Sequence, residues 1–366
     1  MSWLLPDYRP HGRRHGGLRF CGCAIAPDGP AAAPRRGPTI VRGRRARVID
    51  THAHCYFQDA LDLMGADAKG VLPPVRGVPE HFLAQDDVLR TRLDAMERMG
   101  VDLQVLSINP FWYRKDRDTA EAICRIHNER LAELCAREPK RFAAFASLAM
   151  QHPDLAVRQL EHAVRELGLK GAAIGGSVDG RDFAHAEYHP VLAKAQELGV
   201  TLFIHPQSTP QLAERFRGNG WLSNVIGNPL DTTIALQKLI FEGVLDRFPD
   251  LKVLAAHGGG FLGSYAPRMD RSCAVSPQNC DPAIVLRSRP TESLRRLHFD
   301  ALVFTPEALR HLVAEVGASQ VVVGTDHPIP WEEDPVGHVM STPELSGDAR
   351  LAILGGNAAR LLGLDP

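Results

Sequence analysis

The chain has 366 residues, 44% hydrophobic and 6% aromatic, and a formal net charge of −1. This length accommodates one large domain of the barrel type or two ordinary domains. No apolar run reaches the roughly 18 residues that a membrane-spanning helix needs, so the composition argues against a membrane protein and predicts a soluble one.

The start of the chain differs in composition from the rest. Residues 1–47 contain ten Arg, no Lys and two Asp, a net charge of +8, and they are rich in Gly and Pro. Such a segment buries too little apolar surface to offset its ordering entropy, so residues 1–46 are predicted to be a disordered basic extension. A nucleic-acid-binding arm and a transit peptide are less favoured than a non-functional leader, because the segment lacks aromatic interleaving and an amphipathic helical pattern.

The seven cysteines are odd in number and scattered, without zinc-ribbon spacing. Reduced thiols in a cytoplasmic protein are therefore expected. Cys21 and Cys23 form an isolated C-x-C pair, and metal binding is the less favoured interpretation of that pair.

From residue 47 onward, short apolar runs alternate with longer helical patterns. The expected strands are 47–50, 102–108, 142–148, 171–175, 200–205, 252–257, 297–302 and 320–326. The expected helices are 86–99, 118–137, 154–167, 188–198, 231–247, 261–271, 306–316 and 346–362. Eight such βα units predict a closed (β/α)₈ TIM barrel over 47–366.

An open doubly wound sheet is the competing fold, but a G-x-G-x-x-G after the first strand and a P-loop are both missing from the sequence. Two long insertions interrupt the regular pattern, at 55–85 after the first strand and at 206–230 after the fifth. The first exceeds an ordinary βα loop and is predicted to be a lid over the barrel mouth.

Polar side chains occur at the ends of the predicted strands, where a barrel of this kind builds its active site. They are His52, His54, His205, His257, Asp300 and Asp326. His52 and His54 in "VIDTHAHC" are two residues apart, so both imidazoles point to the same side of an extended chain. Histidines His52, His54 and His205 with carboxylate Asp326 suit Zn²⁺ and leave a position for water.

A single ion is predicted. Two-metal barrels commonly carry a bridging carboxylated Lys at the end of the fourth strand, whereas this strand ends "AAIGG" and Lys170 lies at its start. His257, in "AAHGGG", is interpreted as a general base near the metal, although its glycines could merely form a tight turn. Asp326 is a ligand, a proton relay or both, and Asp300 either orients His257 or caps a helix.

The motifs "IDTHAH", "LFIHP", "AAHGGG" and "VVVGTDHP", in this order, resemble the amidohydrolase-2 branch of the amidohydrolase superfamily. Within that branch the chain is most similar to 2-amino-3-carboxymuconate 6-semialdehyde decarboxylases, from about residue 47 to the C-terminus. The resemblance implies a mononuclear zinc, non-oxidative decarboxylase on a (β/α)₈ barrel, usually dimeric. It places the zinc ligands on His52, His54, His205 and Asp326 and the catalytic histidine on His257.

The resemblance also implies two arginines that hold the substrate carboxylate, for which the planar guanidinium is well suited. Arg268 matches the one that the neighbouring subunit supplies, and Arg76 is the candidate in the lid. Pocket residues depart from the familiar pattern: Gln207 replaces an aromatic residue, and Asn224 stands where a pocket Trp is expected. Trp112, with Tyr113, is predicted to supply aromatic surface instead, and Trp221 and Phe57 are weaker candidates.

The leading hypothesis is a decarboxylase of an unsaturated or aromatic carboxylic acid with one Zn²⁺ per subunit, or Mn²⁺ in its place. The expected partners are a small carboxylate substrate and a second copy of the chain, with no nucleic acid and no membrane. A hydrolase or hydratase that uses the same metal on an amide, lactone or activated double bond is the alternative. A metal-binding scaffold with a basic head that recruits nucleic acid is a third, less favoured hypothesis.

Overall fold

The structure is a computed structural model that describes residues 37–68, 83, 85–207 and 209–365. The predicted C-x-C pair of Cys21 and Cys23, the lid arginine Arg76 and most of the predicted basic extension lie outside the described residues.

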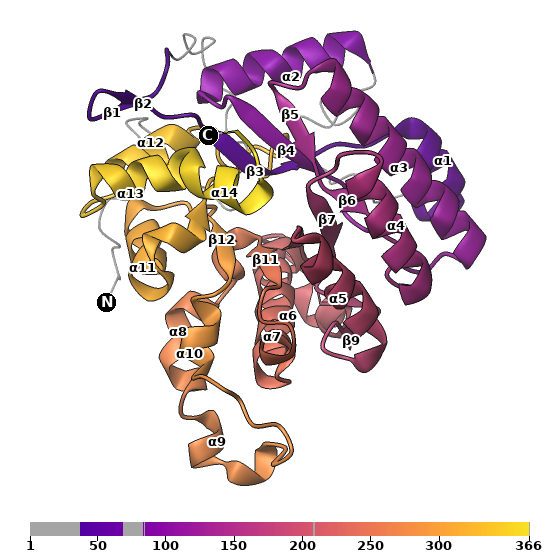
Figure 1. Ribbon diagram of the computed structural model, residues 1–366, viewed down its shortest axis with the longest axis vertical. Helices are drawn as coiled ribbons and strands as arrows, with labels where there is room; N and C mark the ends of the chain where they lie inside the picture. Colours follow the sequence, from indigo (N-terminus) through magenta and orange to yellow (C-terminus); the bar gives the residue numbers. More distant parts are fainter. Residues whose placement is uncertain (1–36, 69–82, 84, 208, 366) are drawn as a thin grey trace.

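Parallel strands form the centre of the described chain (Figure 1). Consecutive strands pair side by side, and isolated bridges from Asp50 to Val323 and from Ala53 to His327 join the last to the first. The order is therefore that of a closed ring, as predicted for a (β/α)₈ barrel. The strands are β3 (Ile49–His54), β4 (Leu103–Ser107), β5 (Phe142–Ala144) with β6 (Ala146–Ser147), β7 (Gly171–Ile174), β10 (Thr201–Ile204), β11 (Lys252–Ala255), β12 (His298–Asp300) and β13 (Val321–Val322).

Helices surround the strands on the outside (Figure 1). They are α1 (Gln58–Met64), α2 (Asp86–Met99), α3 (Arg117–Arg137), α4 (Pro153–Arg165), α5 (His189–Leu198), α6 (Asn228–Phe241), α7 (Val244–Arg247), α8 (Leu262–Met269), α9 (Ser272–Val275), α10 (Pro290–Leu294), α11 (Pro306–Val316), α12 (Pro335–Ser341), α13 (Gly347–Leu351) and α14 (Asn357–Leu362). Each crossover helix buries an apolar stripe against the ring, which is why the helical and extended periods alternate in the sequence.

Some boundaries differ from those expected. The helix predicted over 231–247 is divided into α6 and α7, because Gly243 adopts a left-handed conformation with φ of 68° between them. The strand predicted over 142–148 is interrupted at Phe145. Within the segment predicted as a disordered extension, β1 (Ile40–Val41) pairs with β2 (Arg44–Arg45) in an antiparallel hairpin.

The two predicted insertions are described only in part. The first contains α1 and a 3₁₀ turn at Gly65–Ala68, and Asp59 of α1 forms an ion pair with Arg130 of α3 at 3.1 Å. Residues 69–82 and 84 fall outside the described chain, so the lid stays a prediction. The second insertion forms a 3₁₀ helix at Pro210–Phe216 and a π-helix at Ser223–Gly227.

The barrel interior is filled by buried apolar side chains contributed by most of its strands. They include Ile49, Leu103, Val105, Phe145, Phe203, Leu254 and Val322, all at most 1% exposed. This packing closes the centre of the ring, so that a ligand can only reach the ends of the strands.

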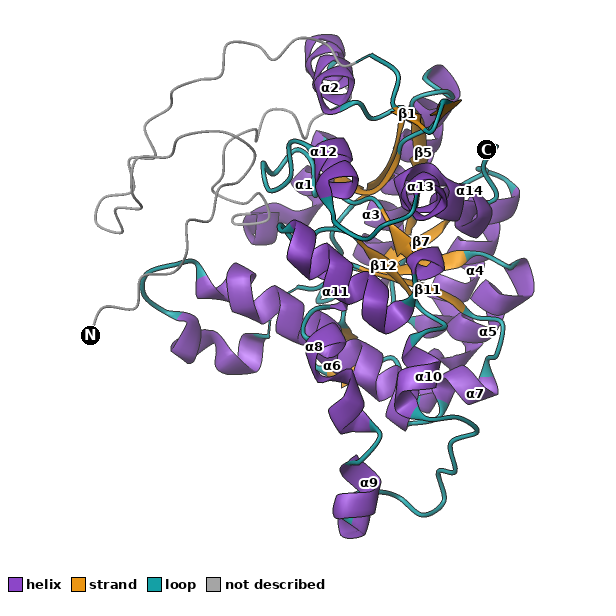
Figure 2. Ribbon diagram, turned by 90° about the vertical axis from the view of Figure 1, so that its left-hand side faces the viewer, coloured by secondary structure: helices purple, strands orange, loops and turns teal. Residues whose placement is uncertain are grey.

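Helices α8 and α10 pack against α11 and α6, and the segment between them, which contains α9, projects beyond the barrel as an arm (Figures 1 and 2). In this arm Cys273 and Cys280 form a disulfide, with their Cα atoms 5.8 Å apart. The expectation that all cysteines are reduced is therefore wrong for this pair. The turn between α9 and Cys280 brings the two sulfur atoms together, which sequence spacing alone does not predict. Cys55, Cys124 and Cys135 are free.

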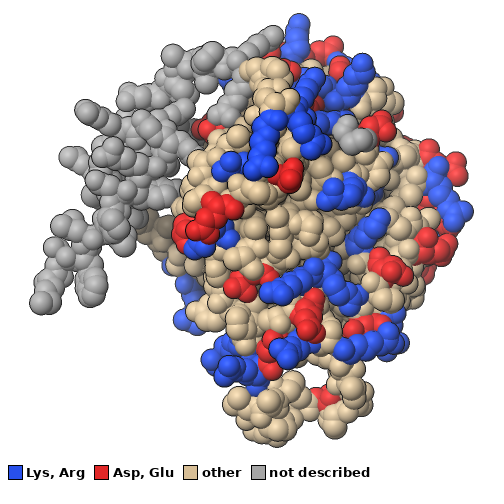
Figure 3. Space-filling view, turned by 60° about the vertical axis from the view of Figure 1, so that its left-hand side comes forward, with Lys and Arg blue, Asp and Glu red and all other residues tan. Residues whose placement is uncertain are grey.

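Acidic and basic side chains are interspersed over the face shown in Figure 3. No helix in the part of the chain that the structure describes is long and apolar enough to cross a membrane.

Candidate metal centre and active site

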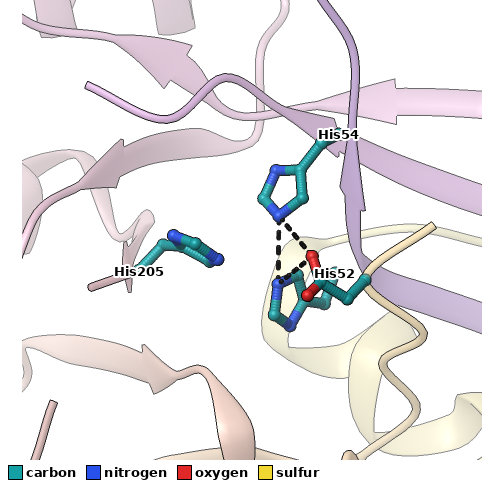
Figure 4. Close-up of side chains that lie close together, drawn as sticks. His52, His54 and His205 are labelled. Carbon is teal, nitrogen blue, oxygen red and sulfur yellow. Dashed lines mark hydrogen bonds and ion pairs between the residues drawn. The ribbon is translucent and has the colours of Figure 1, made fainter. Parts of the chain in front are cut away.

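Four side chains from three separate strand units meet at one end of the barrel. His52 and His54 lie on β3, His205 follows β10 and Asp326 follows β13. One ligand atom from each lies within 4.8 Å of every other, and all four residues are at most 4% exposed. Figure 4 shows the imidazoles of His52, His54 and His205 facing a common space.

The contacts within this cluster are those of metal ligands. Nε2 of His52 lies 3.1 Å from Nε2 of His54, and Oδ1 of Asp326 lies 2.9 Å from the same atom of His54. Both ring nitrogens of His205 are buried and find no hydrogen-bond partner among the described residues. Buried polar atoms are normally paired, so the unpartnered ring nitrogens of His205 beside this cluster fit a shared cation.

The electrostatics of the cluster favour positive charge. Burial opposes protonation of His52, but Asp326 and Asp300 outweigh it and raise the pKa of His52 to about 10. Burial lowers the pKa of His54 and of His205, and so keeps both in the neutral form that binds metals. Burial alone would raise the pKa of Asp326, yet the neighbouring imidazoles, His52 first, bring it well below its ordinary value.

Asp300 of β12 holds one of these ligands from behind. Its Oδ2 accepts a hydrogen bond from Nδ1 of His52 at 2.6 Å, which leaves Nε2 of that ring free to face the cluster. The same carboxylate accepts the backbone N–H groups of His257 at 3.0 Å and Gly258 at 2.9 Å. Asp300 therefore orients the backbone of His257, which is one of the two roles considered for it. It also orients the imidazole of His52, a role that the sequence did not reveal.

His257 lies beside the cluster and remains accessible from it. Its Nε2 is 3.9 Å from Oδ2 of Asp326, and its side chain is 14% exposed. His257 and Asp326 both have left-handed backbone conformations, with φ of 55° and 62°. Such conformations are costly for residues other than glycine and concentrate at functional sites, where the surrounding structure fixes them.

The described residues contain one cluster of potential metal ligands, and the number of ions that it binds stays a prediction. Lys170 precedes β7, at the opposite end of that strand from the cluster. His327, which follows Asp326, is buried, and its carbonyl accepts the N–H of His54 at 2.7 Å.

The predicted substrate-binding residues have less uniform positions, and their roles remain predictions. Trp112 is 0% exposed, donates its indole N–H to the carbonyl of Leu148 at 2.9 Å and packs on His127, which are contacts of a core side chain. Asn224 is half-buried in the π-helix that follows β10. Arg268 is exposed on α8.

A cavity between α6, α8 and α9 includes Arg268 and Arg271 in its wall but none of the four clustered ligands. Because the titratable groups converge at the barrel mouth and not in this cavity, we assign the chemistry to the mouth.

Comparison with known proteins agrees with this site. A family described as Amidohydrolase matches residues 49–364. The chain belongs to the amidohydrolase family. Its four clustered ligands and His257 all lie within the matched residues.

Several curated and solved relatives of the chain are decarboxylases by name. A 2-amino-3-carboxymuconate-6-semialdehyde decarboxylase of Dictyostelium discoideum is 34% identical over 75% of this chain and 76% of its own length. The structure of 5-carboxyvanillate decarboxylase from Sphingomonas paucimobilis is 26% identical, with a TM-score of 0.76 over 87% of this chain and 100% of that one.

A third relative was solved with a metal. Dihydroxybenzoic acid decarboxylase from Polaromonas sp. JS666, with bound manganese and the inhibitor 2-nitroresorcinol, is 27% identical, with a TM-score of 0.75 over 87% of this chain and 97% of that one. The resemblance found in the sequence is thereby confirmed at the level of the family.

Proposed function

We propose that this protein is a metal-dependent, non-oxidative decarboxylase of an aromatic or unsaturated carboxylic acid. The observation that carries the proposal is the buried cluster of three imidazoles and one carboxylate with His257 beside it, in a chain similar to named decarboxylases. Zn²⁺ suits this mixture of nitrogen and oxygen ligands, and the manganese in the Polaromonas relative supports Mn²⁺ as the alternative.

The bound cation would supply Lewis-acid stabilisation of the charge that develops on the substrate. The protein's own side chains handle the protons. When the bond between the substrate carbon and its carboxylate breaks, CO₂ leaves and the carbon needs one proton. His257 and Asp326 are 3.9 Å apart, close enough for a proton to pass between them with a small shift or through one water. Asp300 holds the backbone of His257 during this transfer.

Cationic side chains are needed to hold the substrate carboxylate, and the four clustered ligand residues do not include one that could do so. We assign this role to Arg268 of a partner subunit and to Arg76 in the lid over the mouth, with Asn224 contributing to the pocket. Exposed apolar side chains in α8 and the arm support the homodimer, since Tyr265, Val275 and Val285 are 64%, 79% and 83% exposed. Monomeric proteins rarely leave so many large apolar side chains in one segment uncovered.

A cytoplasmic location is the remaining part of the proposal. The buried free thiols of Cys55 and Cys124 support it, whereas the Cys273–Cys280 disulfide is unusual in that compartment.

The test measures CO₂ release when protein reconstituted with Zn²⁺ or Mn²⁺ is incubated with each member of a panel of carboxylates. The panel contains 2-amino-3-carboxymuconate semialdehyde, 2,6-dihydroxybenzoate and 5-carboxyvanillate, with the amides and lactones of related acids beside them. Metal-dependent CO₂ release that His205→Ala abolishes would support the proposal. Ring opening or amide cleavage without CO₂ would instead support the hydrolase alternative.

Subunit mixing tests the cross-subunit role of Arg268. We expect His257→Asn and Arg268→Ala proteins, each of low activity alone, to recover up to about a quarter of wild-type activity after they exchange subunits. Random exchange makes about half of the dimers mixed, and one of the two sites in each mixed dimer regains both residues. No recovery on mixing, together with a monomeric wild type in sedimentation, would contradict it.

A further inference from the structure

Arg92 is a fully buried cation that the chemistry described above does not use. It lies on α2 at 0% exposure, on the helix face that also carries Leu89 and Met96. Its position three residues after Leu89 and four before Met96 puts it in the apolar stripe. Because a buried charge is costly unless it is fully hydrogen-bonded, its partners indicate what the residue is for.

Two of these partners are backbone carbonyls next to metal ligands. Nη1 of Arg92 donates to the carbonyl of His54 at 2.7 Å, and Nη2 donates to the carbonyl of His327 at 3.4 Å. His54 is itself a candidate ligand, and His327 directly follows the ligand Asp326. One guanidinium therefore ties the first strand of the barrel to the segment that follows its last strand.

The third partner extends the link to the other ligand of β3. Nε of Arg92 donates to Oε1 of Gln104 at 2.9 Å, and Nε2 of Gln104 donates to Oδ2 of Asp50 at 2.9 Å. Leu103 and Val105 on either side of Gln104 point into the barrel, so Gln104 faces the helix layer. The Gln104 amide thus accepts a hydrogen bond from the Arg92 cation through its oxygen and donates one to the Asp50 carboxylate through its nitrogen.

Asp50 completes the connection on the same two segments. Its Oδ1 accepts the backbone N–H of His52 at 3.1 Å and that of Thr325 at 3.1 Å, and its Oδ2 accepts the Thr325 hydroxyl at 2.6 Å. His52 is a ligand, and Thr325 directly precedes Asp326. We call the hydrogen-bonded series Arg92, Gln104 and Asp50 the buried brace. It forms hydrogen bonds with backbone groups of, or next to, three of the four ligands.

The seam that the buried brace crosses lacks a regular ladder. Among the described residues, β3 meets the segment after β13 through two isolated bridges, and the register of β3 against β4 shifts between Asp50 and Ala53. A ladder fixes the spacing of strands by evenly repeated hydrogen bonds, and an irregular seam does so less well. The buried brace supplies side-chain hydrogen bonds at this irregular place.

We propose that Arg92 is a positioning residue, which acts through Gln104 and Asp50 to fix the relative placement of His52, His54 and Asp326 and so sets the affinity and coordination geometry of the metal site. The inference rests on the metal site of the proposed function but not on the reaction. A purely structural Arg92 would affect folding stability, whereas a positioning Arg92 also changes how a cation is held.

The experiment measures Co²⁺ binding by full-length, metal-stripped protein, without substrate. Visible absorption of Co²⁺ reports its ligand geometry, competition with a chelator gives its affinity, and thermal unfolding is followed in parallel. The variants are Arg92→Met, Arg92→Lys and Gln104→Leu. Asn357→Leu is the matched control, because Asn357 is 2% exposed and donates to the carbonyls of Ala318 and Val321 at 2.7 Å, at the opposite end of β13.

Arg92→Met is expected to weaken Co²⁺ binding about 10- to 100-fold and to alter the spectrum. Arg92→Lys recovers part of the affinity, since one ammonium still reaches a carbonyl, and Asn357→Leu loses stability with affinity and spectrum unchanged. An Arg92→Met protein with affinity within twofold of wild type and an unchanged spectrum would overturn the inference. Where Arg92→Met does not fold, Gln104→Leu decides by the same criteria. A wild type that binds no Co²⁺ would overturn the metal site itself, and this inference with it.

Discussion

Oδ2 of Asp300 lies 2.6 Å from Nδ1 of His52, and neither side chain is exposed to solvent. The two residues come from β12 and β3, strands that do not pair with each other. A carboxylate behind an imidazole fixes the ring and its tautomer and raises its basicity toward a metal. This pair links the metal site to His257, whose backbone N–H the same carboxylate accepts.

Asp300→Asn is expected to weaken metal binding about 10- to 100-fold, because a neutral amide no longer holds His52 with a negative charge. Chelator competition on metal-stripped protein measures the change. Asp102→Asn is the control, since the Asp102 carboxylate accepts the N–H of Val48 at 2.8 Å, away from the ligands. Equal metal affinities for Asp300→Asn and wild type would show that the carboxylate does not support the site.

Gly324→Ala tests the close approach behind the same pair. A Cβ at residue 324 would lie 2.7 Å from Cβ of Asp300 and 3.0 Å from Cβ of His52, so one of the two must move. We expect a loss of about 1–3 kcal/mol in the free energy of unfolding, measured with guanidinium, together with weaker metal binding. Gly263→Ala in α8, whose Cβ would meet only Leu312 at an ordinary 3.9 Å, is expected to leave metal binding unchanged and not to lower the free energy of unfolding.

His257→Asn separates proton transfer from metal binding. The imidazole lies beside the four clustered ligands and is not one of them, so the variant is expected to keep its metal content. The turnover number on whichever carboxylate proves to be a substrate is expected to fall about 10²- to 10⁴-fold, the usual contribution of a general acid–base group. Elemental analysis and steady-state kinetics on one preparation measure both. Loss of the metal would place His257 among the ligands instead.

Burial of His127 is expected to lower the free energy of unfolding in mild acid. Burial lowers the pKa of His127 to about 3, whereas the same residue in an unfolded chain titrates near 6.5. Below pH 6.5 the unfolded chain binds a proton that the folded protein excludes, so stability is complete above pH 6.5 and falls as the pH approaches 3. By pH 5 the loss amounts to about 2 kcal/mol of the free energy of unfolding.

Urea unfolding at pH 7.5 and pH 5 measures this loss. His127→Phe keeps a ring packed against Trp112 and is expected to reduce the difference between the two pH values by about that amount. His185→Phe, at a side chain 61% exposed, is expected to leave the difference as it is in wild type. A difference of the same size in wild type and His127→Phe would rule out His127 as its source.

The amino-acid sequence by itself determined the alternation of strands and helices and the position of the metal ligands at strand ends. These features are local: a strand or a helix shows its period within a few residues, and polar residues that end apolar runs identify the mouth of a parallel barrel. His52, His54, His205 and Asp326 could be proposed together for this reason, before any distance was known. The same reasoning could not place Arg268 or Trp112 relative to the site, because both lie outside the strand ends.

Only the tertiary structure decided which buried polar groups support those ligands. Asp300 and His52 are separated by 248 residues, and Arg92 reaches the carbonyl of His327 across 235. Arg92 stands in an apolar helical stripe and Gln104 within an apolar strand, but neither pattern names a partner. Hydrogen bonds and disulfides depend on atoms that approach within a few ångströms, and closure of the ring brings these atoms together.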